Sequence, residues 1–230
     1  MSRKAKVSWI FSLLLWPSLQ SLMLASDSST RQEPLDQRET SHPKQESRVT
    51  VLVYNYARLP METLRESEDR ASLIFRKAGV EVDWADCPLN NEDPALYPGC
   101  PELSGPTQLF LRIFAKTATK VDIGGEAFVA ARIANIFWNR VEEQAQRLHV
   151  TSTRFLAHTV AHELGHLLLG SNSHSPVGIM TARWDAPTVT RIRQEGLYFH
   201  GQQSELMRSE MSKRKGQPMI VENAMLSSPR

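Results

Sequence analysis

The sequence predicts an α/β fold: a twisted, mixed β-sheet packed on helices, with a small helical part at the C-terminal end. Three observations support this prediction. A strand-helix-strand pattern opens the ordered region, several short strand patterns follow it, and one long apolar helix lies in the second half of the chain. Of the 230 residues, 41% are hydrophobic and 23% are charged, which is enough for one domain with a packed core.

The first part of the chain is not expected to belong to this domain. Residues 1–25 have a basic start, an apolar run and a small residue, Ala25, at its end, which is the layout of a secretory signal peptide. An uncleaved membrane anchor is the alternative, and Pro17 and scattered polar residues within the run disfavour it. We therefore expect a secreted or periplasmic protein with no stable membrane insertion after cleavage. Residues 26–47 are polar and are expected to form a disordered leader or a pro-segment.

The folded domain is expected to span residues 48–212. Apolar and β-branched residues from Arg48 onwards predict a first strand. A helix is expected to begin at Pro60 and to end at Gly79, where a second strand begins. Because two strands joined by a helix pair in parallel with a right-handed crossover, this segment predicts a parallel β-α-β unit.

Shorter patterns continue the domain. They predict strands over 109–114, 127–131 and 133–138, a weak helix over 144–148, the main helix from Ser152 or Thr153 to Leu169, and two further helices over 187–193 and 202–211. From Lys213 the chain is polar, so residues 213–230 are expected to form a flexible tail.

The two cysteines, Cys87 and Cys100, enclose a turn-rich loop. An even number of cysteines in an exported protein predicts a disulfide, and a loop of this length predicts a stabilisation of roughly 3 kcal/mol. Two zinc-binding thiolates are the alternative, which the spacing and the lack of a second cysteine pair disfavour.

The main helix carries the pattern HExxH, formed by His162, Glu163 and His166. Histidines four residues apart lie about 40° apart around a helix axis, so both imidazoles can bind one ion. Neutral imidazole suits Zn²⁺, and a glutamate beside the metal is the general base of zinc peptidases. The sequence therefore predicts Zn²⁺ as cofactor and Glu163 as the catalytic residue.

The third ligand is less directly indicated. His174 follows the glycine that ends the helix, while Glu195 is the chief alternative and Asp185 a weaker one. His158 lies one turn before His162 and is expected to be a structural or supporting histidine, because a fourth protein ligand would close the site.

Three further candidate residues follow the motif. Tyr198 and His200 are either oxyanion donors or, as we expect, ordinary packing and surface residues. Trp184 is expected to lie in the core or in the wall of the pocket.

The stretch HELGHLLLGSNSH, followed by GIM, resembles the metzincin clan of zinc peptidases, whose pattern is HExxHxxGxxH with a methionine turn after it. The resemblance implies an α+β zincin-like fold, with Met180 as the methionine below the metal. Gly170 comes one residue late and His174 two residues late, and Asn172 occupies the strict third position. Since asparagine is a poor ligand for Zn²⁺, His174 is the preferred third ligand.

The predicted function is a zinc metallopeptidase, an endopeptidase that acts on peptides or proteins. A net charge of +2 does not indicate a nucleic acid as partner. Two other interpretations remain open: a non-catalytic exported zinc-binding or interaction domain on a peptidase scaffold, and a zinc hydrolase of non-peptide amides. A complete HExxH argues against the first, because a domain that only binds zinc does not need Glu163.

Overall fold

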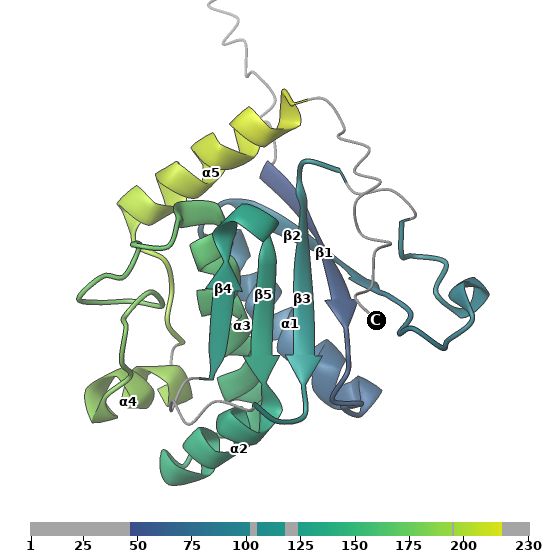
Figure 1. The fold of residues 1–230 in the computed structure, drawn as a ribbon. Helices are drawn as coiled ribbons and strands as arrows, with labels where there is room; N and C mark the ends of the chain where they lie inside the picture. The colour runs from purple at the N-terminus through teal and green to yellow at the C-terminus, as the bar shows by residue number, and fades with distance from the viewer. Residues whose placement is uncertain (1–46, 102–104, 118–123, 195, 218–230) are drawn as a thin grey trace, which may run out of the picture. The chain divides into compact units, whose positions relative to one another are not determined.

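The computed structural model describes residues 47–101, 105–117, 124–194 and 196–217. In this part of the chain, a five-stranded sheet has the order β2-β1-β3-β5-β4 (Figure 1). Strands β1, β2, β3 and β5 run parallel, and β4 runs antiparallel to β5. Helices α1 and α3 pack against each other on one face of the sheet. The predicted mixed sheet packed on helices is therefore confirmed.

The β-α-β unit is formed by β1 (Ser47–Tyr54), α1 (Met61–Lys77) and β2 (Val80–Asp86). Alternate residues of β1, at positions 49, 51 and 53, are buried beneath the helices. Gly79 follows the helix with a φ of +76°, a left-handed conformation that glycine adopts at little cost. The parallel pairing of β1 with β2 confirms the predicted crossover unit.

The middle of the chain differs from the predicted boundaries. It forms β3 (Gln108–Phe114), β4 (Gly125–Phe128), β5 (Ile133–Phe137) and α2 (Trp138–Arg147), with short 3₁₀ turns at Pro94–Leu96 and Val129–Ala131. The strand predicted over 127–131 is wrong at both ends, because pairing with β5 starts at Gly125 and Val129 already turns. The weak helix predicted over 144–148 is only the second half of α2, whose Val141 and Ala145 face the core.

Helix α3 (Ser152–Leu169) is the centre of the domain. Its N-cap is Thr151, whose hydroxyl accepts a hydrogen bond from the backbone N–H of Arg154, so the caps predicted at Ser152 or Thr153 are one or two residues late. Its residues are buried on almost every face, because strands β3, β4 and β5 and helices α1, α2, α4 (Ala186–Gln194) and α5 (Gly201–Lys215) all contact it.

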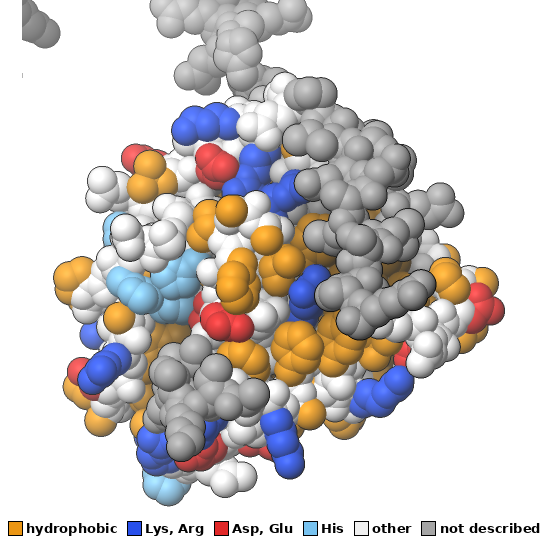
Figure 2. Space-filling view, in the orientation of Figure 1, with side chains coloured by type: hydrophobic (Ala, Val, Ile, Leu, Met, Phe, Trp, Pro, Cys, Tyr) orange, Lys and Arg blue, Asp and Glu red, His pale blue; other side chains and the backbone are white. Residues whose placement is uncertain are grey.

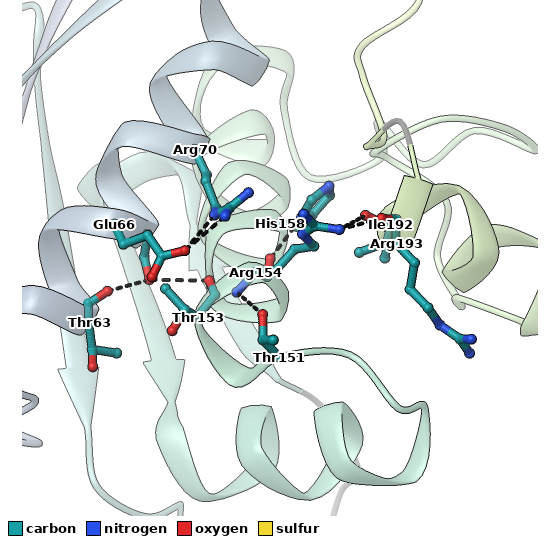
Figure 3. A network of polar contacts seen from close by, with 10 residues as sticks. Thr63, Glu66, Arg70, Thr151, Thr153, Arg154, His158, Ile192 and Arg193 are labelled. Carbon is teal, nitrogen blue, oxygen red and sulfur yellow. Dashed lines mark hydrogen bonds and ion pairs between the residues drawn. The ribbon is translucent and has the colours of Figure 1, made fainter.

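Polar contacts fix the N-terminal half of α3 on two sides (Figure 3). On one side, the hydroxyl of Ser67 in α1 lies 3.2 Å from the carbonyl oxygen of Thr153. On the other side, the guanidinium of Arg154 donates to the carbonyl oxygens of Ile192 and Arg193. These contacts attach the helix to α1 and to α4 (Ala186–Gln194), so it cannot slide along its axis without breaking them.

The C-terminal helix α5 (Gly201–Lys215) is longer than predicted. A flexible tail was expected over residues 213–230, and α5 continues as far as Lys215. The reason lies in Arg214, which is buried and donates to the carbonyl oxygen of Leu167, 2.7 Å away, and to Glu210. Residues 218–230 lie outside the described part of the chain.

A disulfide joins Cys87 and Cys100, as predicted. Cys87 packs with Leu52 and Ala85 in a small cluster separate from the main core. The predicted signal peptide (1–25) and most of the predicted leader (26–47) lie outside the described residues. Within the residues that are described, no helix is long and apolar enough to cross a membrane.

We expect loss of the disulfide to lower the free energy of unfolding by about 3 kcal/mol, since it closes a short loop that is free in the reduced, unfolded chain. Urea unfolding of the protein with and without a reductant measures this. The double variant Cys87→Ser/Cys100→Ser is the control and should not respond to the reductant. Identical midpoints for the oxidised and reduced protein would contradict the prediction.

Candidate metal centre

Three histidines converge at the C-terminal half of α3. His162 and His166 lie on the helix and His174 on the turn that follows it. The Nε2 atom of His166 lies 3.1 Å from Nε2 of His162 and 3.2 Å from Nε2 of His174. The structure thus brings together the three residues that the sequence singled out as ligands.

The hydrogen bond at the other ring nitrogen determines the tautomer of His162. Its Nδ1 atom lies 2.8 Å from the carbonyl oxygen of Ile179. A carbonyl oxygen only accepts, so Nδ1 carries the proton. In the neutral imidazole, Nε2 is then unprotonated and directs a lone pair toward His166.

The same argument applies to His166 through a serine. Nδ1 of His166 lies 2.9 Å from the hydroxyl oxygen of Ser173, and this hydroxyl donates its proton to the carbonyl oxygen of Gly170, 2.6 Å away. The serine oxygen must therefore accept from Nδ1–H of His166. As a result, Nε2 of His166 is also unprotonated.

Two unprotonated nitrogens 3.1 Å apart cannot form a hydrogen bond with each other. A shared cation removes this repulsion. Tetrahedral zinc with Zn–N bonds of 2.0–2.1 Å places its ligand nitrogens about 3.3 Å apart, close to the two contacts found here. The donor set and the tautomers of His162 and His166 therefore fit a Zn²⁺ ion.

Burial favours the neutral forms of His162 and His166. It lowers the pKa of His162 to about 4 and holds the pKa of His166 below its usual range. His174 is exposed at the surface, so the cluster opens to solvent on this side. In Figure 2, histidine side chains form a surface patch beside the sheet, next to an acidic side chain.

Glu163 is buried against the terminal strand β4. A Cβ atom at Gly125 would lie 2.7 Å from Cγ of Glu163, so only glycine permits this approach. Burial, together with the smaller effect of the nearby charge of Glu126, raises the pKa of Glu163 to about 8. A cation held by the histidines would act in the opposite direction and favour the ionised carboxylate.

The turn that ends at Met180, residues 178–180, is called the methionine turn here and packs directly against α3. A Cβ atom at Gly165 would lie 2.7 Å from Sδ of Met180 and 2.8 Å from Cε1 of Phe199. The small residue between the two helical histidines thus allows the turn to pack against the helix. This contact also places the carbonyl of Ile179 beside His162.

Glu163 and the three histidines line one cleft of about 780 Å³. Strand β4 forms one wall, and Trp184 and the segment before it form another. The cleft continues along α3 to Phe155 and Thr159 and to Arg147 and Leu148 at the end of α2. Trp184 packs edge-on against Phe155 and His162, which confirms the prediction that it is a pocket wall.

Two of the other candidate residues have structural roles. His158 is buried, its Nδ1 faces the carbonyl oxygen of Arg154, and its Nε2 accepts from the backbone N–H of Leu197. Burial lowers its pKa to about 4, so it is a neutral structural histidine. Asp185 accepts a hydrogen bond from the backbone of Thr188 at the start of α4, away from the histidine cluster.

The remaining candidates do not join the cluster in the described part of the chain. His200 is the N-cap of α5, and the ring of Tyr198 carries the ammonium of Lys77 on its face at 4.1 Å. Asn172, in the strict third position of the motif, is exposed. Glu195 lies outside the described residues.

Three participating residues were not predicted: Ser173, Glu126 and Gln203. Ser173 directly precedes the proposed ligand His174, so a role for its hydroxyl near the site could have been predicted from the sequence. Gly125, which opens β4 beside Glu163, was not predicted to be part of the site either.

No protein-family model matches the sequence, and a comparison with curated proteins finds no match either. Among solved structures, the chain is similar to a zinc-dependent peptidase from Methanocorpusculum labreanum, with 15% identity, 68% of this chain and 99% of the other covered, and a TM-score of 0.48. It is also similar to archaemetzincin from Methanopyrus kandleri, with 18% identity, 73% and 98% covered, and a TM-score of 0.48. The histidine triad is consistent with the HExxH…H motif of metzincins. At this level of similarity, the function must be argued from the side chains of the site.

Substituting Gly165→Ala should lower the free energy of unfolding, by on the order of 1 kcal/mol. Overpacking against Met180 and Phe199 costs about 1–3 kcal/mol, and the better helix propensity of alanine returns at most about 1 kcal/mol. Gly201→Ala is the control, because a Cβ there meets no atom within 4 Å. Thermal unfolding of both variants measures the difference. Equal stabilisation by the two substitutions would refute the close packing of the methionine turn.

Proposed function

We propose that the protein is a zinc-dependent metallopeptidase, an endopeptidase that hydrolyses peptide bonds with Glu163 as general base. The observation that carries the proposal is the pair of unprotonated Nε2 atoms of His162 and His166, 3.1 Å apart, with His174 beside them. A histidine set of this kind holds zinc, and a buried carboxylate in the same cleft supplies the base.

Each residue has a defined role in the proposed reaction. His162, His166 and His174 hold the ion. Bound zinc would lower the pKa of a water molecule and polarise a carbonyl oxygen. Glu163 accepts the proton of the attacking water and passes it to the leaving amine. Its position against Gly125 leaves the carboxylate little freedom, which favours a single orientation during both transfers.

A peptide is the substrate that the cleft supports best. The volume of about 780 Å³ is within the range of ligand sites. Strand β4 is the terminal strand of the sheet and lines the cleft beside Glu163. An extended peptide can pair with such an edge through main-chain hydrogen bonds, which places a peptide bond near the histidines. A hydrolase of non-peptide amides would make no use of this edge, and a non-catalytic zinc-binding or interaction domain would make no use of Glu163.

Export also belongs to the proposal. The basic and apolar start of the sequence supports secretion or a periplasmic location, and the Cys87–Cys100 pair suits an oxidising compartment. An extracellular or periplasmic peptidase would act on peptides or proteins outside the cytoplasm.

Substituting Glu163→Gln should lower kcat for peptide hydrolysis at least ~10²-fold while zinc remains bound, because the amide cannot accept the proton. Cleavage of an unstructured protein, together with the zinc content of the variant, measures both effects. Glu205→Gln on the exposed face of α5 is the matched control. Undiminished cleavage by the Glu163→Gln variant would overturn the mechanism. A wild-type protein that binds zinc but cleaves no peptide would support one of the two alternatives.

Substituting His174→Ala should weaken zinc binding by more than the roughly 10–100-fold that loss of an outer-shell partner costs. Glu195→Ala should leave the affinity unchanged. Competition with a chromophoric chelator gives the dissociation constants. The reverse pattern would assign the third ligand to Glu195.

A further inference from the structure

The turn from Gly170 to His174 is long for its task. Seven residues separate His166 from His174, two more than in the HExxHxxGxxH pattern that the motif resembles. A longer turn has more conformational freedom to lose when it is held in one form. A ligand on such a turn therefore needs additional contacts that hold it toward the other two histidines.

Ser173 provides the first of these contacts. Its hydroxyl accepts from Nδ1–H of His166 at 2.9 Å and donates to the carbonyl oxygen of Gly170 at 2.6 Å. One side chain thus determines the tautomer of His166 and ties the end of the turn to its beginning. His174 is the next residue, so its backbone is fixed at the same time.

Gln203, in the first turn of α5, provides the second contact. Its side chain is buried, and its Nε2 atom donates to the carbonyl oxygen of Ser173 at 3.4 Å and to the hydroxyl of Ser175 at 3.3 Å. These two acceptors are the neighbours of His174 on either side. The amide oxygen of Gln203 accepts from the backbone N–H of His200, which determines which end of the amide faces the turn.

Helix α5 is itself firmly attached to the domain. His200 and Gln203 form a capping box at its start. Further along, Arg208 donates to the carbonyl oxygen of Ala78, and Arg214 donates to that of Leu167, each at 2.7 Å. The contacts of Gln203 therefore connect the ligand turn to a fixed part of the fold.

We propose that Ser173 and Gln203 are positioning residues of the metal centre, which hold the long turn so that His166 and His174 present Nε2 to one ion. The proposal rests on the proposed zinc site. The lengthened turn carries the hydroxyl that holds His166, and α5 acts as the frame for the third ligand.

The test measures zinc affinity in the full chain, by competition with a chromophoric chelator, and the visible spectrum of the Co²⁺ form. Ser173→Ala and Gln203→Glu should each raise the zinc dissociation constant roughly 10–100-fold. Glutamate keeps the acceptor of the capping box but cannot donate to Ser173, so it removes the tether and adds one negative charge. Ser173→Thr retains the hydroxyl and should restore most of the affinity. The Co²⁺ bands should shift in the first two variants.

Two matched controls accompany these variants. Gln202→Glu adds the same charge on the exposed face of α5, and Asn172→Ala changes an exposed residue of the same turn. Both should bind zinc within twofold of the wild type. Unchanged affinity and unchanged Co²⁺ spectra in Ser173→Ala and Gln203→Glu would overturn the proposal while leaving the zinc site intact. A wild-type protein that binds no zinc would overturn the metal centre itself.

Discussion

The metal centre depends on one constraint: the imidazole nitrogens that face one another must lack protons. Without their outer partners, His162 and His166 could exchange tautomers, and the 3.1 Å contact between them would become an ordinary N–H···N hydrogen bond. The pair would then satisfy itself and leave no lone pairs for an ion. The carbonyl of Ile179 and the hydroxyl of Ser173 prevent this by holding the proton of each ring on Nδ1. The surrounding fold must therefore fix the tautomers of both rings.

The fold meets this constraint by burying α3 on almost every face. Two close approaches determine the geometry, β4 against Glu163 through Gly125 and the methionine turn against Gly165. Neither approach is compatible with a larger side chain at the glycine unless a neighbour moves. The low polarity that results also keeps His162 neutral and makes the charge on Glu163 costly. The contacts that pack α3 into the fold therefore also determine the protonation of His162 and Glu163.

Local features of the site could be predicted from the sequence. HExxH lies on a single helix, so the helical repeat alone places His162 and His166 on one face, and the following turn brings His174 within reach. Features that depend on distant segments could not be predicted. Gln203 meets the turn from 28 residues away, at Ser175, and no local pattern indicates that contact.

The fold shows the same division. The β-α-β unit has clear periodicity and was predicted correctly, whereas the boundaries of β4 and α2 were not. Helix α5 extends beyond the predicted start of the tail because Arg214 bonds to Leu167, 47 residues earlier in the chain. Short apolar runs fit a strand or a helix equally well until their partners are known.

The residues that hold the ligand turn in place are synthesised after the turn itself. A nascent chain that has emerged only as far as His174 already carries all three imidazoles. It still lacks Tyr198, whose carbonyl accepts from the backbone N–H of Ile179, and Gln203. Because domains fold as units, the contacts that hold the ligand turn are complete only once α5 has docked. The three histidines are therefore fixed in their final positions late, after the HExxH motif itself has been translated.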